Sequence, residues 1–195
     1  MESPYRSIRA AYVARGAREY YQQHGSAYRN PHEPAIGELI AAVVRDWPVN
    51  VTHVFDLAAG SGEVTLALQA CCGDDLMTVD AADPFTADAY AQRTGRSCQP
   101  LSFEDIAAGG LADRHFSLIA CSFALHLADS SRLPSICQAM AITSPRLLIL
   151  TPHKRPMIQP AWGWTMTHEM LLNRVRARLY ESALHTSGSS PSGGG

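Results

Sequence analysis

The chain has 195 residues, of which 46% are hydrophobic and 17% are charged, which is typical of a folded globular protein rather than a disordered one. Its formal net charge of −2 argues against broad electrostatic capture of nucleic acid, because phosphate contacts need clustered lysine and arginine. No apolar run reaches the roughly 18 residues of a membrane span.

The five cysteines lack the Cys-x-x-Cys or Cys/His spacing of a metal site. We therefore expect reduced thiols, no metal and a cytoplasmic location. The arginines of the N-terminal segment leave a mitochondrial address as the alternative, although Glu2 and Glu19 interrupt that pattern.

The N-terminal part of the sequence predicts two helices separated by an irregular loop. Apolar spacing indicates helices over 5–23 and 36–47. The segment 25–34 holds a glycine and two prolines, so it is expected to be a loop. Loops on a rigid frame often carry binding groups, and Tyr28 and Asn30 are candidates for contacts from a lid.

Strand-like and helix-like segments alternate through the middle of the chain. The sequence predicts strands over 51–56, 76–80, 97–101, 116–121 and 146–151, and helices over 63–71, 86–93 and 129–142. Such alternation predicts an α/β fold with a doubly wound, mostly parallel, Rossmann-like sheet and helices on both faces. A ligand is then expected over the carboxyl ends of the strands.

The segment 162–184 has two interpretations. It can form an amphipathic helix, but residues 174–180 alternate strictly between polar and apolar, which favours an antiparallel hairpin with its turn near Asn173. We expect one domain over 1–184, with N-terminal helices and a lid loop over 1–48 and a core over 51–184. The Ser/Gly-rich residues 185–195 are expected to form a flexible tail.

A glycine-bearing turn follows the first predicted strand. The strand ends at Asp56, the turn contains Gly60 and Gly62, and a helix is expected from Glu63. This unit lets a ligand approach the backbone at a helix N-terminus. No Lys-Ser or Lys-Thr follows Gly62, as a phosphate-cradling loop would require, and the third glycine of a dinucleotide site is missing. The acidic residues would repel a pyrophosphate but not S-adenosylmethionine, which carries a sulfonium and an ammonium group.

The run from Asp56 to Gly62, Asp-Leu-Ala-Ala-Gly-Ser-Gly, resembles the first motif of the class I S-adenosylmethionine-dependent methyltransferases. Ala58 stands where the family pattern has its first glycine. The resemblance implies S-adenosyl-L-methionine as cofactor, with Asp56 near its ammonium group and Ala58, Gly60 and Gly62 beside its amino-acid end.

The resemblance also implies an acidic residue for the ribose at the end of the second strand. Asp80 and Asp83 both lie near the expected spacing of about 20 residues from the motif. We favour Asp83, because Pro84 and Phe85 behind it offer a flat apolar surface to an adenine ring. The alternative is that Asp83 only caps a helix.

The resemblance places the remaining parts of the cofactor site after the next two predicted strands. Ser102 and Phe103 are the candidates for the adenine edge, and Cys121 ends a strand similar to the family's fourth motif. The Pro-Pro-aromatic signature of enzymes that methylate exocyclic base amines is missing there. We therefore expect a small-molecule acceptor rather than a nucleobase.

Two histidines follow strand ends on the acceptor side. His126 and His153 are candidates for a catalytic base, since proton removal from an acceptor needs a group with a suitable pKa. Two other functions stay open: a nicotinamide-dependent oxidoreductase on a similar fold, and a non-catalytic methyltransferase-like protein that binds a cofactor or a partner.

Overall fold

The computed structural model describes residues 29–185. Its sheet contains the strands β1 (His53–Leu57), β2 (Thr78–Ala82), β3 (Leu118–Ser122), β4 (Arg146–Thr151), β5 (Trp164–Leu172) and β6 (Val175–Ser182). The α-helices are α3 (Glu33–Asp46), α4 (Glu63–Cys72), α5 (Ala87–Thr94), α6 (Phe103–Ala107) and α7 (Leu133–Thr143). Short 3-10 helices are η2 (Asp74–Leu76), η3 (Leu125–Leu127) and η4 (Pro160–Trp162). The predicted helix over 5–23, the lid candidate Tyr28 and the tail from residue 186 on lie outside the described residues.

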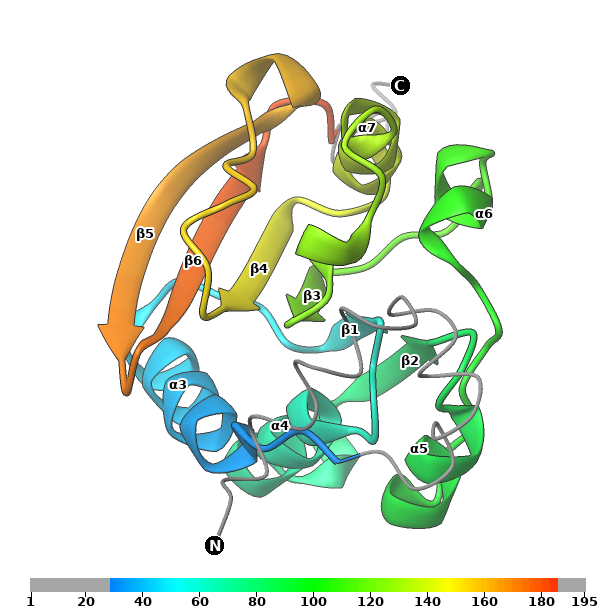
Figure 1. The fold of residues 1–195 in the computed structure, drawn as a ribbon. Helices are drawn as coiled ribbons and strands as arrows, with labels where there is room; N and C mark the ends of the chain where they lie inside the picture. Colours follow the sequence, from blue (N-terminus) through cyan, green and yellow to red (C-terminus); the bar gives the residue numbers. More distant parts are fainter. Residues whose placement is uncertain (1–28, 186–195) are drawn as a thin grey trace, which may run out of the picture.

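The strands form one sheet in the order β2-β1-β3-β4-β6-β5. The first four strands are parallel, and β6 pairs antiparallel with both β4 and β5. Helices α3, α4 and α5 lie on one face of the sheet, and α6 and α7 lie on the other (Figure 1). The structure thus confirms the predicted doubly wound, mostly parallel α/β sheet with a C-terminal hairpin.

Both faces of the central strands are buried, which explains their nearly continuous apolar sequence. Val54 of β1 packs with the cluster beneath α3 and α4, while its neighbour Phe55 packs with the cluster beneath α6 and α7. The same alternation places Leu148 and Ile149 of β4 on opposite faces. None of the helices in the described part of the chain is long and apolar enough to cross a membrane.

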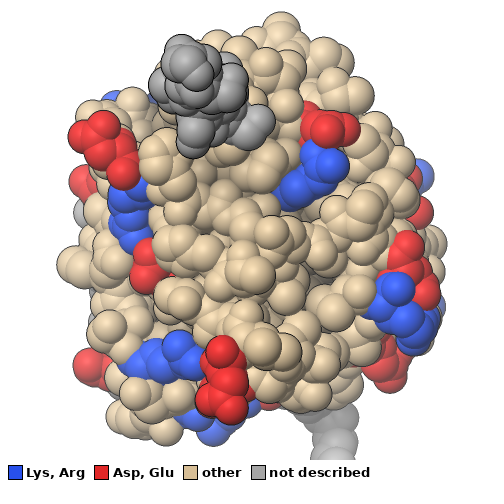
Figure 2. Space-filling view, turned by 180° about the vertical axis from the view of Figure 1, so that it is seen from behind, with Lys and Arg blue, Asp and Glu red and all other residues tan. Residues whose placement is uncertain are grey.

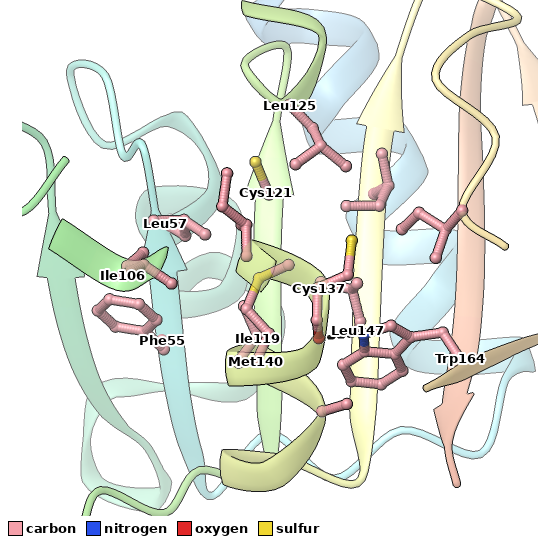
Figure 3. Close-up of a cluster of buried hydrophobic side chains, with 14 of the residues drawn as sticks. Phe55, Leu57, Ile106, Ile119, Cys121, Leu125, Cys137, Met140, Leu147 and Trp164 are labelled. Carbon is pink, nitrogen blue, oxygen red and sulfur yellow. Dashed lines mark hydrogen bonds between the residues drawn. The ribbon is translucent and has the colours of Figure 1, made fainter. Parts of the chain in front are cut away.

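A tryptophan joins the hairpin to α7 in the core. The Trp164 side chain is fully buried, and its indole Nε1 donates a hydrogen bond to the Cys137 carbonyl oxygen at 2.8 Å. Figure 3 shows this bond beside Leu147 and Met140. The tryptophan therefore fixes the start of β5 against the middle of α7 by a directional contact as well as by apolar packing.

The hairpin closes with a two-residue turn at Asn173 and Arg174, which have φ values of 48° and 65°. Positive φ at both central residues is the geometry that fits the twist of paired strands. The Asn173 side chain also donates to Glu38 of α3 at 2.8 Å. Between Met166 and His168 the register of β5 against β6 shifts, which marks a β-bulge in the edge strand.

The prediction of a strand over 97–101 was wrong. Only Gln99 bridges to Ala82, in parallel orientation. Its backbone N–H donates to the Ala81 carbonyl, and its own carbonyl accepts from the Asp83 N–H. Pro100 follows at once and has no N–H to continue a ladder, so the pairing stops after one residue.

Other boundaries moved by a few residues. The second strand was expected over 76–80, but it runs two residues later because Asp80 is accommodated inside it by Arg114, whose Nη2 lies 3.1 Å from the carboxylate. The helix expected over 129–142 begins only at Leu133. Helix α6 was not predicted; Ser102 and Asp105 form a capping box at its start.

Charges of both signs lie next to one another on the surface. The side seen from behind in Figure 2 shows acidic groups next to basic groups at several places around a largely uncharged middle. Arg146 and Glu181, for example, are 2.7 Å apart. On this side, the described residues form no continuous basic region of the kind that phosphate backbones attract.

We expect Trp164→Phe to destabilise the fold by roughly 1–3 kcal/mol, because it removes a buried hydrogen bond to α7 and leaves part of the indole volume unfilled. Trp162→Phe is the matched control, since Trp162 is only partly buried. Urea unfolding followed by circular dichroism measures both. Equal, small losses in the two variants would show that the hydrogen bond contributes little.

Candidate functional site

A cavity of about 510 Å³ opens at the carboxyl ends of β1, β2 and β3. This is the edge at which a parallel sheet gathers the loops that follow its strands. Its wall is formed by Asn30, Leu57, Ala58, Ala59, Gly60, Glu63, Val64, Asp83, Pro84, Phe85, Thr86, Pro100, Leu101, Ser102, Phe103, Glu104, Asp105, Ser122, Phe123, Ala124, Leu127 and Ala128.

The glycine turn between β1 and α4 has a left-handed backbone at three positions. Ala58, Gly60 and Gly62 have φ values of 54°, 58° and 89°. The alanine in this region costs about 1–2 kcal/mol relative to an ordinary conformation. Ala58 and Gly60 line the cavity. Gly62 does not, because it faces α5, where a Cβ would lie 2.4 Å from Thr94 Cγ2.

Asp83 connects the end of β2 to the glycine turn. Its Oδ2 accepts the Gly60 N–H at 3.2 Å, and its Oδ1 accepts the N–H groups of Phe85 at 2.9 Å and Thr86 at 3.1 Å. Burial raises its pKa above the ordinary aspartate value, although these three donors act in the opposite direction. Asp83 therefore shapes the turn and also presents a carboxylate in the cavity wall.

Glu63 begins α4 and is almost fully buried in the cavity wall. Its Oε1 accepts the Asn30 N–H at 3.0 Å and the Ser61 hydroxyl at 2.6 Å, and its Oε2 accepts the Ser61 N–H at 3.1 Å. Asn30, the expected lid residue, thus lies in the wall, held by backbone contact to the helix that follows the turn.

Arg93 of α5 ties these parts together. Its Nη1 donates to the Ser61 carbonyl at 3.2 Å and to the Ser61 hydroxyl at 2.9 Å, and lies 3.5 Å from Glu63. Its Nη2 forms an ion pair with Glu33 at the start of α3. One guanidinium therefore connects α5, the glycine turn, α4 and α3.

Asp56 lies behind the cavity wall. Its Oδ2 accepts the Thr65 hydroxyl at 2.7 Å and the Thr65 N–H at 3.2 Å, while its Oδ1 has no hydrogen-bond partner among the described residues. Full burial raises the pKa of Asp56 to about 7. The structure gives this residue a direct role in holding α4 against β1.

A capping hydrogen bond organises the part of the cavity wall at the start of α6. The Ser102 hydroxyl donates to Asp105 at 2.6 Å, which fixes the start of α6, and Phe103 and Leu101 complete an apolar wall there. The hydroxyl oxygen of Thr86, beside Asp83 in the cavity wall, is buried and has no hydrogen-bond partner among the described residues. Such orphaned groups favour a polar ligand in the cavity.

The third side of the cavity follows β3. Phe123 has a positive φ of 57°, and its ring stacks on His32 with centroids 4.9 Å apart. The buried Ser122 hydroxyl beside it has no hydrogen-bond partner within the described part of the chain. Cys121, the residue before, points into the core, where burial raises its thiol pKa to about 12.

His126 and His153 come together although they are far apart in sequence. Their ring centroids are 4.5 Å apart in an edge-to-face arrangement. Partial burial of the His126 ring lowers its pKa, and the neighbouring His153 lowers it further. Neither ring forms the cavity wall, but His126 belongs to η3, which contributes Leu127 to it.

The structure therefore divides the predicted site residues into two groups. Ala58, Gly60, Asp83, Phe85, Ser102 and Phe103 line the cavity, whereas Asp56, Gly62, Cys121, His126 and His153 lie behind or beside its wall. Sequence reasoning missed the wall residues Glu63, Thr86, Ser122 and Phe123. It also missed Arg93, whose role depends on partners in other elements. Residues 29–185 contain no group of three or more potential metal ligands.

We expect Asp56→Asn to stabilise the protein at high pH. In the folded state the pKa of Asp56 is about 7, against roughly 3.9 in the unfolded chain. The folded state thus binds the extra proton between these values, and stability falls as pH rises through this window, by up to about 1.4 kcal/mol per unit. The amide keeps an acceptor for Thr65 and carries no charge.

Melting temperatures measured from about pH 5 to about pH 8 test this expectation. Asp56→Asn should exceed the wild type most at the alkaline end, and the difference should narrow toward the acidic end. Asp75→Asn, at an exposed position, should leave the profile unchanged. A parallel loss of stability at every pH would contradict the raised pKa.

We expect Gly62→Ala to destabilise the fold, because its Cβ would collide with Thr94 Cγ2. Thr94→Ser removes that methyl and keeps the hydroxyl that donates to the Tyr90 carbonyl at 2.8 Å. The double variant should therefore recover most of the loss, apart from about 1–2 kcal/mol of left-handed strain. Thermal melting of both single variants and the double variant measures the recovery, and its absence would place the main defect elsewhere.

This chain was compared with known proteins by sequence and by structure. No family model matches the chain. An uncharacterized protein of Schizosaccharomyces pombe is 33% identical, and the alignment covers 92% of this chain and 93% of that protein.

Solved structures show the same fold at lower identity. The magnesium protoporphyrin IX methyltransferase of Synechocystis PCC 6803, with bound SAM, is 13% identical with a TM-score of 0.57, over 93% of this chain and 97% of that one. The N-methyltransferase NodS of Bradyrhizobium japonicum WM9, with S-adenosylhomocysteine, is 13% identical with a TM-score of 0.59, over 83% and 96%. Mitomycin 7-O-methyltransferase is 17% identical with a TM-score of 0.59, over 90% of this chain and 60% of that one.

These likenesses agree with the resemblance carried by Asp56–Gly62. The chain belongs to the same family as the fission yeast protein, and its fold is that of the class I S-adenosylmethionine-dependent methyltransferases.

Proposed function

We propose that this protein binds S-adenosyl-L-methionine in the cavity at the carboxyl edge of the sheet and transfers its methyl group to a small-molecule acceptor. The observation that carries the proposal is the glycine turn with its surrounding carboxylates. Ala58 and Gly60 bring backbone to the cavity surface, and Glu63 and Asp83 contribute buried carboxyl groups to the same wall.

The charge of this wall fits the proposed cofactor. A sulfonium and an ammonium group are favoured by nearby carboxylates, whereas a pyrophosphate would be repelled by them. The one described guanidinium in contact with the turn is Arg93, and its donors are directed to Ser61 and Glu33. These features also count against a nicotinamide dinucleotide.

Each region of the cavity wall is proposed to contact a different part of the cofactor. Asp83 is the proposed partner of the ribose hydroxyls, since it ends β2 in the cavity, while Asp80 lies inside β2 and pairs with Arg114. Phe85, Ser102 and Phe103 form the proposed adenine side. The orphaned Ser122 hydroxyl is available to polar atoms of a bound molecule.

When bound, the cofactor supplies a methyl group that is open to in-line attack by a nucleophile. The protein contributes position above all, by bringing an acceptor to the wall formed by Phe123, Ala124 and Leu127. His126 or His153 is the proposed base for an acceptor that must lose a proton. The pairing of their rings beside η3 supports this role, and positioning without a base is the alternative mechanism.

A cytoplasmic location belongs to the same proposal. All five cysteines are free thiols, as a reducing compartment would keep them. The rival view, a methyltransferase-like protein without turnover, predicts cofactor binding but no methyl transfer to any acceptor.

We expect S-adenosylhomocysteine to bind and NAD not to bind, and Asp83→Asn to weaken binding more than Asp80→Asn. Loss of a charge-assisted hydrogen bond costs about 1.5–3 kcal/mol, which corresponds to roughly a tenfold or greater loss of affinity. Asp80→Asn is the control, because it makes the same chemical change three residues earlier, inside β2 and outside the cavity. Isothermal calorimetry measures all three proteins.

Two results would overturn this assignment. Heat from NAD but none from S-adenosylhomocysteine would reverse the choice of cofactor. A larger effect of Asp80→Asn than of Asp83→Asn would place the ribose elsewhere.

A further inference from the structure

The loop after β4 gathers cationic and titratable groups beside η3, which contributes Leu127 to the cavity wall. His153 is fixed there by its backbone N–H, which donates to the Thr151 hydroxyl at 3.1 Å, and its ring meets that of His126. Since His126 directly precedes the wall residue Leu127 in η3, this loop lies next to the side of the cavity that follows β3.

The next two residues, Lys154 and Arg155, are exposed. Lys154 is the only lysine in the sequence. Most arginines of the described chain pair with a carboxylate, but neither Lys154 nor Arg155 has a described carboxylate within ion-pair distance. Two cations in sequence beside two imidazoles make this loop a site of uncompensated positive charge.

A buried arginine holds this loop in place. Arg178 of β6 donates from Nη1 to the Lys154 carbonyl at 3.2 Å and from Nε to Glu169 at 2.9 Å. Glu169 also lies 3.8 Å from Arg176. Glu169 pairs with these two arginines and forms no ion pair with Lys154. The Lys154 carbonyl anchors the backbone of the loop to β6.

The cavity wall next to this loop is apolar. Leu127 is 41% exposed although it lines the cavity, and Phe123 adopts a left-handed backbone that presents its ring to His32. A non-glycine residue in this conformation is strained and is found preferentially at functional sites. An acceptor against this wall would meet the apolar surface of Phe123 and Leu127, and the loop that carries Lys154 and Arg155 reaches the same region through the contact of His153 with His126.

From this arrangement we infer that the methyl acceptor is a small organic acid, with an apolar body against Phe123 and Leu127 and an anionic group at Lys154 and Arg155. The inference rests on the proposed function, since it assigns the acceptor of that same cavity. The two ends of the site then differ in charge: carboxylates surround the glycine turn, and cations border the acceptor side. The same polarity disfavours an acceptor bound in the reverse direction.

The single lysine offers a direct test. Reductive methylation with carbon-13 labels Lys154 and the N-terminal amine and keeps their charge, so the lysine can be followed by NMR in the full chain. Benzoate and benzamide are the probes, because they have the same shape and differ in charge. We expect benzoate to shift the Lys154 signal and the His126 and His153 imidazole signals at concentrations about tenfold lower than benzamide does, as one charge-assisted hydrogen bond implies.

Arg155→Gln should reduce the preference for benzoate, whereas Arg45→Gln, an exposed arginine at the far end of α3, should not. Equal shifts by the two probes, no shift by either at tens of millimolar, or an unchanged preference in Arg155→Gln would overturn the inference. Shifts by a short single-stranded RNA at lower concentration than benzoate would overturn it in favour of an RNA acceptor.

Calorimetry with S-adenosylhomocysteine, run on the same samples, separates this inference from the proposed function. Absence of cofactor binding would defeat the proposed function, while the benzoate titration would still report whether the loop binds anions. Cofactor binding without a preference for benzoate would leave the proposed function standing and remove the organic acid.

Discussion

The contact on which the site depends is the one made by Arg93. Its guanidinium joins Ser61 of the glycine turn, Glu63 at the start of α4 and Glu33 at the start of α3. The Glu63 carboxylate is buried and would be costly to bury alone, because desolvation of an unpaired charge exceeds what packing returns. The Arg93 guanidinium therefore allows the acidic glycine turn to lie between α3, α4 and α5 in a fixed conformation.

The compensation is incomplete, and this has consequences for ligands. Asp56, Glu63 and Asp83 are all buried near the turn, and burial raises the pKa of both Asp56 and Asp83. A ligand that brings positive charge therefore gains from the field of the wall as well as from its own contacts. The binding of such a ligand also stabilises the folded chain, since it acts only on the native state.

Local patterns in the sequence predicted much of the frame. The apolar run that ends at Asp56, followed by a glycine turn, indicated the first strand-turn-helix unit, and the strict alternation after Arg174 indicated the hairpin. The choice between Asp80 and Asp83 could not be settled in this way, because β2 continues past a charged residue that Arg114 neutralises from another element. Arg93 gave no signal at all, since its partners lie 32 and 60 residues away in the sequence.

The β-bulge in β5 has a bearing on how the molecule behaves in concentrated solution. β5 is the outer strand of the sheet, and the backbone groups of such a strand invite pairing with a strand from another copy. The register shift between Met166 and His168 twists that edge locally. A neighbouring chain can then match only a short stretch on either side of the bulge, so the irregularity that interrupts the hairpin also protects the protein against edge-to-edge aggregation.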